Sequence, residues 1–285
     1  MSAPDVRLTV LFEGLSFGEG PRWHDGRLWV SDFYTHRVLA IADDGSAEAI
    51  VEVPNRPSGL GWLPDGRLLV VSMTDRRLLR LDGATLVEHA DLSEIAGGDC
   101  NDMVVDPSGR AYVGNFGYDF ARGGTPKSAT LALVGPDGAV SPAATELQFP
   151  NGTVITPDGS TLVLGETFGR RLTAFDIAPD GSLSNRRVWA DLGDVTPDGI
   201  CLDESLGVWV ADPTNSQCVR VLEGGEVTDR IPTAQGCFAC MLGGADRRTL
   251  HLVTGELTSD VDRLTVERPG RIETMRVDVP GAGWP

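Results

Sequence analysis

The amino-acid sequence predicts an all-β protein, a six-bladed β-propeller formed as one domain over residues 1–285. Short runs in which apolar and polar residues alternate are separated by Asp-Gly, Pro-Asp-Gly and Gly-Gly turns along the whole chain, and helical periodicity is almost absent. In addition, one phrase recurs: an apolar strand, an Asp-Gly turn, a strand that ends in polar residues, and an Arg followed by hydrophobic residues. A repeat of about 40 to 50 residues is typical of four-stranded propeller blades.

The copies of this phrase account for the chain in order. They begin at Glu19, Ser58, Asn101, Asn151, Asp198 and, in degenerate form, at about Cys237. The third copy makes a longer detour, NFGYDFARGGTPKSATLAL from Asn115, before its third strand. The segment VRLTVLFEG precedes the first copy, and we expect it to supply an outer strand to the sixth blade, because closing the ring removes two exposed strand edges.

Composition excludes several classes of function. A chain of 285 residues that is 41% hydrophobic can build a large core without disulfides. The formal net charge of -17 repels phosphate backbones and anionic lipids, and no run of Lys and Arg offsets it, so neither nucleic acid nor a membrane is an expected partner. No signal-peptide or membrane-span pattern is present, which favours a cytoplasmic protein with a small-molecule ligand. The sequence does not indicate an oligomeric state.

The five cysteines are expected to be reduced. Their number is odd and they are scattered in a chain without an export pattern. Cys237 and Cys240 form a C-x-x-C, but no second pair accompanies them and no βαβ pattern surrounds them. Buried strand cysteines are therefore favoured over a zinc or redox site.

Equivalent positions in the repeat carry the candidate site. The residue just before each innermost strand is Glu19, Ser58, Asn101, Asn151, Asp198 and, in the last copy, Cys237 or Phe238. Innermost strands line the central channel, so these residues should form a ring at one of its mouths. Two carboxylates at short range need a neutralising charge, and Asp, Glu and Asn oxygens suit a hard dication such as Ca²⁺ or Mg²⁺ while leaving Mn²⁺, Fe²⁺ and Zn²⁺ open.

Two features of the sequence allow other interpretations. Asn151-Gly152 and Asp198-Gly199 could be ordinary turns at strand starts. Gly14 to Gly18 also matches the G-x-S-x-G pattern of serine hydrolases, with Ser16 as the nucleophile. A nucleophile elbow needs a helix after its Ser, which two glycines and Pro21 disfavour, so Ser16 is predicted to be a loop residue.

The phrases GEGPRW, NDMVVDPSGR, PNGTVITPDG, PDGICLD with GVWVAD, and GCFACMLGG resemble the regucalcin and gluconolactonase family of six-bladed propellers over almost the whole chain. Diisopropylfluorophosphatase is more distantly similar. The resemblance implies one divalent cation, Ca²⁺ first and Zn²⁺ next, held by Glu19, Asn151 and Asp198. It also implies that Asp198 is the general base and that Asn101, beside the metal, contacts substrate or completes the metal shell. Sugar-lactone members place an Arg two residues before the ring Asn, where this chain has Asp99, so a gluconolactone would be held differently.

The predicted function is metal-assisted hydrolysis of a lactone or related cyclic ester, with Asp198 assisting the attack of water. Two alternatives remain: a phosphotriester hydrolase that uses the same metal site, and a non-catalytic binding propeller whose metal is structural. Substrate contacts are expected from Asn101 and Asp99 and from aromatic residues of the loops over the channel. The aromatic candidates are Phe120, Phe168 and Phe238, with Phe116, Tyr118 and Arg122 in the detour of the third blade. Simple aromatic packing at the surface is the alternative for these loops.

Overall fold

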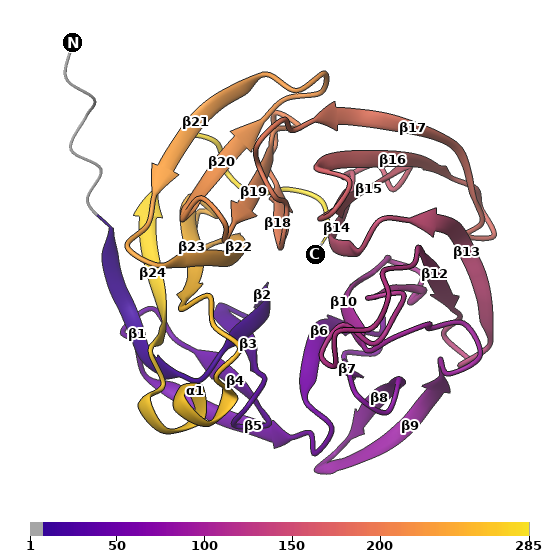
Figure 1. Ribbon diagram of the computed structural model, residues 1–285, viewed down its shortest axis with the longest axis horizontal. Coiled ribbons are helices and arrows are strands. Elements are labelled where there is room, and N and C mark those ends of the chain that lie inside the picture. Colours follow the sequence, from indigo (N-terminus) through magenta and orange to yellow (C-terminus); the bar gives the residue numbers. More distant parts are fainter. Residues whose placement is uncertain (1–7, 285) are drawn as a thin grey trace.

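The computed structural model describes residues 8–284, in which six four-stranded antiparallel sheets stand as blades around a central channel (Figure 1). Blade 1 contains β2 (Gly18–His24), β3 (Arg27–Asp32), β4 (Arg37–Ile41) and β5 (Ala47–Glu52). Blade 2 contains β6 (Pro57–Trp62), β7 (Leu68–Ser72), β8 (Arg77–Asp82) and β9 (Thr85–Asp91). Blade 3 contains β10 (Cys100–Val105), β11 (Ala111–Asn115), β12 (Ala129–Val134) and β13 (Val140–Leu147).

The remaining blades follow the same order. Blade 4 contains β14 (Pro150–Ile155), β15 (Thr161–Glu166), β16 (Arg171–Ile177) and β17 (Leu183–Asp191). Blade 5 contains β18 (Ile200–Leu202), β19 (Val208–Asp212), β20 (Gln217–Val221) and β21 (Val227–Pro232). Blade 6 contains β22 (Gly236–Gly243), β23 (Thr249–Gly255), β24 (Gly270–Arg276) and, at its outer edge, β1 (Thr9–Leu15). The six-bladed all-β prediction is confirmed.

The ring is closed by the first strand of the chain. β1 pairs antiparallel with β24, from Thr9 opposite Thr274 to Leu15 opposite Gly270. The expected outer strand is therefore present within the predicted segment, whose first two residues lie outside the described residues. Because β1 covers the open edge of β24, the last blade has the same four strands as the others.

Burial falls from the channel outwards, as the propeller geometry requires. Every residue of the innermost strands β10 and β14 is buried, because each of these strands packs between two neighbouring blades. The residues of the outermost strands β5 and β13 are exposed or half-buried, apart from the buried Leu147 at the end of β13, since one side faces solvent. Polar residues in an innermost strand therefore stand out as buried groups that need partners.

The backbone conformations of the turn residues explain why the connections between strands are short. β2 and β3 are joined by Asp25 and Gly26, both with positive φ (48° and 71°), which is the conformation of a two-residue hairpin turn of type I′. One helix, α1 (Val261–Glu267), interrupts the connection between β23 and β24, with Asp260 accepting a bond from the Arg263 N–H at its start. The repeat pattern did not predict this helix. Within residues 8–284, no helix is long and apolar enough to cross a bilayer.

The chain end returns beneath the channel. Gly281 pairs with Asp203 of blade 5, and Trp284 exchanges two backbone hydrogen bonds with Ile155 of blade 4 (2.8 and 3.0 Å). Figure 1 places the carboxyl-terminal end of the chain close to the central channel. We call the end of the channel where the innermost strands begin the upper mouth, and the end covered by this tail the lower mouth.

Candidate metal centre and active site

The predicted ring residues converge at the upper mouth. Four of them lie at the start of an innermost strand and the fifth lies two residues before one. Together we call them the channel ring: Glu19 (β2), Ser58 (β6), Asn101 (β10), Asn151 (β14) and Asp198 (before β18). Their side chains are joined across blades, since Asn101 Nδ2 donates to Asn151 Oδ1 (3.1 Å) and Ser58 Oγ donates to Asn101 Oδ1 (3.4 Å). The Gly152 N–H also donates to the Asp198 carbonyl (3.1 Å).

A repeated irregularity aims these side chains at the channel. Each of β2, β6, β10 and β14 carries a register shift at or directly after the ring position, as between Pro150 and Thr153 in β14. In blades 1, 2, 4 and 5 a glycine follows the ring residue and presses against the next blade. A Cβ on Gly152, for example, would lie 2.7 Å from the Asp198 carbonyl oxygen. Asn151 thus belongs to a bulged strand and not to a turn, which contradicts the turn alternative for Asn151-Gly152.

Hydrogen bonding fixes the orientation of the Asn151 amide. Thr167 Oγ1 donates to the Pro197 carbonyl (2.7 Å), so its lone pair accepts from Asn151 Nδ2 (3.3 Å). The amide oxygen of Asn151 therefore turns the other way, towards Asn101 and the channel. One of its lone pairs is taken by Asn101, and the other remains for a ligand.

Glu19 and Asp198 form an uncompensated pair of carboxylates. Removal from water, followed by the charge of Asp198, holds the pKa of the buried Glu19 carboxyl well above its usual range. Removal from water also raises the pKa of Asp198 to about 8, against the lowering effect of the Asn151 side chain. Within residues 8–284 neither carboxylate has a Lys or Arg partner in an ion pair. Two acids in a poorly hydrated channel are costly unless a cation or a proton joins them.

This donor set fits a divalent cation. Glu19 and Asp198 together balance two positive charges, and Asn151 adds a neutral oxygen, which is the chemistry that hard cations prefer. No three His, Cys, Asp or Glu side chains among the described residues converge on one position. A metal at the upper mouth therefore depends on amide oxygens as well as on the two acids.

One functional candidate was missed by the sequence analysis. Asp102 follows Asn101 at the place where the other ring residues in blades 1 to 5 are followed by glycine. Its carboxylate pairs with Arg22 (2.6 Å), and both side chains are buried. Arg22 also donates to the carbonyls of Pro21 (2.8 Å), Leu60 (3.0 Å) and Met103. In the sequence, the signal for this ion pair was that Asp102 stands where blades 1, 2, 4 and 5 have a glycine after the ring residue.

A second layer of residues stands two positions before the channel ring. Four of them share one backbone contact, in which their carbonyl accepts from the residue after the second strand of the same blade (2.9 to 3.0 Å). We call these four the mouth set: Phe17, Arg56, Asp99 and Phe149. The shared contact shows that they are structurally equivalent in blades 1 to 4. Arg56 and Asp99 are therefore neighbours around the mouth, flanked by two phenylalanines.

Arg56 presents a guanidinium group without an acidic partner. Its Cζ lies 5.0 Å from the ring centre of Tyr34, a cation–π contact, and it forms no ion pair within residues 8–284. Burial raises the pKa of the half-buried Asp99 carboxyl, and the charge of Arg56 lowers it. The two side chains offer opposite charges beside each other at the mouth, as well as donors and an acceptor for hydroxyl groups.

Aromatic side chains surround the upper mouth on two sides. Phe120 and Phe168, which are 49% and 51% exposed, join Phe149 with ring centres 5.3 and 4.6 Å from it. On the other side Phe238 is only 5% exposed and packs on Phe17 at 4.5 Å. Phe120 and Phe168 are therefore exposed at the rim of the mouth, whereas Phe238 is buried and packs against Phe17.

Ser16 and the cysteines have structural surroundings. The Ser16 hydroxyl donates to Asp32 and accepts from the Tyr34 N–H (3.1 Å), and no His is among its hydrogen-bond partners. This agrees with the prediction of a loop residue. All five cysteines are free and buried, as expected. Cys237 and Cys240 lie in the core between blades 5 and 6, so the last position of the ring is apolar.

The chain is similar to known proteins in both sequence and fold. A pentonolactonase of Haloferax volcanii is 26% identical over 94% of this chain and 92% of its own length. A 6-deoxy-6-sulfogluconolactonase of Pseudomonas putida is 24% identical over 94% of both chains. Among solved structures, a calcium-binding regucalcin from Agrobacterium tumefaciens superposes with a TM-score of 0.82 at 21% identity, over 98% of this chain and 96% of the other, and so shares the fold.

The model of the SMP-30/Gluconolactonase/LRE-like region matches residues 17–256. That span runs from the mouth set of blade 1 to the end of β23 and contains the whole channel ring. The chain therefore belongs to the SMP-30, gluconolactonase and LRE-like family of six-bladed propellers.

Proposed function

We propose that this protein is a divalent-metal-dependent hydrolase that opens the ring of a lactone. The observation that carries the proposal is the pair of carboxylates, Glu19 and Asp198, which meet at the upper mouth without a cation from the protein. Two relatives that match 94% of the chain are named lactonases, one for pentonolactones and one for a sulfonated gluconolactone. Both names describe cyclic esters of sugar acids.

Glu19, Asn151 and Asp198 would hold the metal. When bound, a divalent cation supplies a Lewis acid that polarises a carbonyl oxygen. Ca²⁺ is the first choice because every donor is a hard oxygen and a buried thiolate or imidazole is absent from the channel ring. Zn²⁺, Mn²⁺, Mg²⁺ and Fe²⁺ are compatible with the same oxygens.

The side chains around this position have separate tasks in the hydrolysis. Asp198, at the proposed metal position, takes a proton from the attacking water as the general base. The water oxygen bonds to the lactone carbonyl carbon, the ring C–O bond breaks, and the proton passes to the departing ring oxygen to give a hydroxy acid. The Asn101 amide, which is held between Ser58 and Asn151, directs its dipole at the substrate.

The mouth set suggests which lactones are accepted. Arg56 would donate to substrate hydroxyls and Asp99 would accept from them, while Phe17 and Phe149 flank the ring of the substrate. Because Asp99 offsets the charge of Arg56, this layer has little attraction for an anionic lactone, and the net charge of -17 repels one further. We therefore propose a hydroxylated, uncharged lactone as the substrate, with Phe120 and Phe168 closing the rim.

The test is a substrate panel assayed with metal removed and then restored. The panel contains an uncharged aldonolactone, a sulfonated or carboxylated lactone, an unsubstituted lactone and a phosphotriester. We expect a chelator to abolish lactone turnover and each divalent cation to restore it to a different degree, with Ca²⁺ the most effective. Lactone turnover that survives complete metal removal would contradict the proposal. Turnover of the phosphotriester alone would assign the site to phosphotriester hydrolysis, and a chelator effect on thermal stability without any turnover would indicate a binding propeller.

Arg56→Gln tests the assignment of the substrate class. Loss of the charged donors should lower kcat/KM for the hydroxylated lactone by about tenfold or more, since charge-assisted hydrogen bonds are the strong ones. The unsubstituted lactone, which has no hydroxyl for Arg56, should change little. Arg170→Gln, a change of an exposed Arg in the β15–β16 connection, is the matched control. Equal losses on both lactones would remove Arg56 from substrate recognition.

A further inference from the structure

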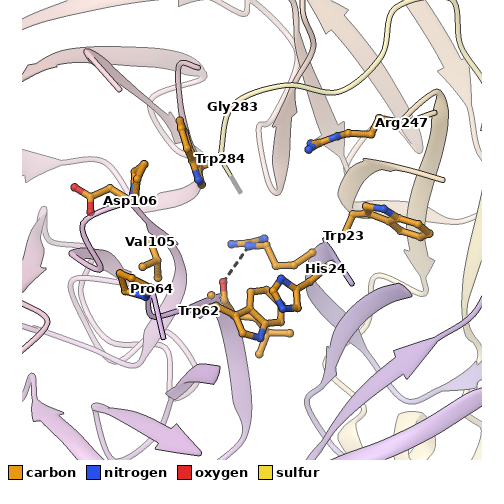
Figure 2. A pocket seen from close by; sticks show the side chains of 13 residues that line it. Trp23, His24, Trp62, Pro64, Val105, Asp106, Arg247, Gly283 and Trp284 are labelled. Atoms are coloured by element: carbon orange, nitrogen blue, oxygen red, sulfur yellow. Dashed lines mark hydrogen bonds between the residues drawn. The ribbon is translucent and has the colours of Figure 1, made fainter. Parts of the chain in front are cut away.

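A cavity of about 280 Å³ opens at the lower mouth, at the end of the channel opposite to the channel ring (Figure 2). Its walls come from the ends of β2, β6 and β10 and from the tail residues Gly283 and Trp284. None of the channel-ring residues lines it. Glu19 and Trp23 are four residues apart on β2, which corresponds to roughly 13 Å of extended chain, so the cavity is separate from the proposed active site.

The aromatic walls of this cavity are held in place. The rings of His24 and Trp62 stack with centres 3.8 Å apart and planes within 9°, and Trp29 meets the edge of Trp62 at 5.3 Å. Trp29 Nε1 also donates to the His24 carbonyl (3.1 Å). On the opposite wall, the two backbone bonds to Ile155 fix Trp284. The cavity therefore has flat apolar surfaces that are formed before any ligand arrives.

Among the charged groups that line the cavity, one lacks a partner. Arg22 pairs with Asp102 and donates to three carbonyls, and Asp106 pairs with Arg110 Nε (2.6 Å) and accepts from two backbone N–H groups. Burial lowers the pKa of His24 and so favours its neutral form. Arg247 forms no ion pair within residues 8–284, and its buried Nε has no hydrogen-bond partner there.

Arg247 is also directed into the cavity by the fold. It follows the turn after β22 with a positive φ of 56°, and its carbonyl accepts from the Gly281 N–H of the tail (2.8 Å). Figure 2 shows its guanidinium extending from the rim of blade 6 towards Trp284 and the stacked His24 and Trp62. A buried donor without a partner is costly, so this position is prepared for an acceptor that the protein does not supply.

We propose that the lower cavity binds a small monocarboxylate with a flat or ring-shaped body. The carboxylate accepts from Arg247, whose planar group suits two parallel hydrogen bonds, and the ring lies against Trp62 or Trp284. A cyclic sugar acid and an aromatic acid share this chemistry. One negative charge balances the single unpaired cation, and the volume is near the lower end of ligand pockets of about 300 to 1,000 Å³. This proposal does not depend on the lactonase assignment.

The test measures binding by calorimetry and by tryptophan fluorescence on the full chain. Glucuronate and benzoate are the two charged probes, and methyl glucoside and benzamide are their neutral counterparts. We expect at least one of the acids to bind and to change the emission of the cavity tryptophans, and its neutral counterpart to bind at least about tenfold more weakly. Whichever acid binds more tightly identifies the body of the ligand. The absence of binding by both acids up to about 1 mM would overturn the proposal.

Two variants locate the binding. Arg247→Met should weaken the bound acid by about tenfold or more, and Arg247→Lys, which keeps a charge without the planar fork, should give an intermediate loss. Arg248→Met, a change of the adjacent Arg that does not line the cavity, is the control. Melting temperatures of the variants show whether each is folded. Equal affinity in wild type and folded Arg247→Met would place the acid elsewhere and refute the site.

Discussion

At the residue scale, the chemistry of the upper mouth depends on two carboxylates that few positively charged groups offset. Arg22 pairs with Asp102 beneath the ring, and its charge lowers the pKa of Glu19 only in part, since that pKa stays well above its usual range. Asp102 adds a further raising influence on the pKa of both acids. The balance at this mouth is therefore completed only by something that enters from outside, which is the basis of the proposed metal dependence.

Asp198→Asn tests the role of the proposed base. The amide is nearly the same size and keeps hydrogen-bonding capacity, so the fold should persist while lactone turnover falls by about 100-fold or more. Steady-state kinetics and thermal melting measure the two effects. Asp194→Asn, which changes an exposed acid of the same loop, is the control. A variant of Asp198 with near-wild-type kcat would show that another group activates water.

The same acids predict how the stability of the metal-free protein depends on pH. The folded pKa of Asp198 is about 8, above its usual 3.8, and that of Glu19 is also raised. The unfolded chain thus releases these protons at lower pH than the folded chain does. The free energy of unfolding should fall as pH rises from about 4 to about 8.

Chelator-treated protein should therefore melt at a lower temperature at pH 8 than at pH 5.5, and Asp198→Asn should reduce that difference. Added Ca²⁺ should raise the melting temperature most at the higher pH, where both acids must be charged. Scanning calorimetry with and without metal measures this. A metal-free protein that becomes more stable over the same interval would contradict burial of the two carboxylates as the origin of their raised pKa values.

At the element scale, the innermost strands position the site through close contact between blades. A bulge in blades 1 to 4 turns the ring side chain to the channel, and in blades 1, 2, 4 and 5 the following glycine lets the next blade approach. The geometry of the ring is therefore a property of strand packing, in contrast to the rim loops, where Phe120 and Phe168 are exposed.

Gly152→Ala tests this dependence on packing. The added Cβ would meet the Ile200 N–H and lie 2.7 Å from the Asp198 carbonyl, so β14 and β18 must separate. We expect a loss of about 1 to 3 kcal/mol in the free energy of unfolding, together with weaker metal binding. Gly165→Ala, whose nearest neighbour would be 3.4 Å away, is the matched control. Urea unfolding and metal titration measure both, and equal effects of the two changes would contradict the packing argument.

The internal repeat explains which parts of the fold and of the candidate site could be predicted from the sequence and which could not. Residues in register, such as Glu19, Asn151 and Asp198, converge because the blades are equivalent, so the ring followed from alignment of the copies. The Arg22–Asp102 pair breaks the repeat, and α1 and the tail occur once in the chain, so no internal comparison reveals them. The residues of the mouth set also occupy equivalent positions in their blades. Phe17, Arg56, Asp99 and Phe149 differ in chemistry, however, so alignment of the copies did not identify them as a set.

At the scale of the whole molecule, the two ends of the chain complete the propeller in different ways. β1 closes the ring at the outer edge of blade 6, and the tail joins blades 4, 5 and 6 beneath the channel through Trp284, Gly281 and their partners. Contacts between residues that are far apart in the chain therefore tie its two ends to the ring of blades.

A chain shortened to begin at Ser16 tests the closure by β1. Loss of this strand exposes the backbone of β24 as an unpaired edge, so the melting temperature should fall by about 5 to 10 °C and the protein should self-associate. Calorimetry and light scattering measure these effects. A chain that begins at Leu8, and so keeps all of β1, is the control. Unchanged melting and a monodisperse short chain would show that closure at this edge contributes little.

The position of the tail has a practical consequence for handling the protein. An affinity tag fused after the last residue would emerge beside Trp284, against the Arg247 cavity, where a tag carboxylate could compete with small acids in a titration. A tag placed ahead of β1 joins the chain at the outer edge of blade 6, away from the tail. Binding and kinetic measurements are therefore best made with an amino-terminal tag, or with none.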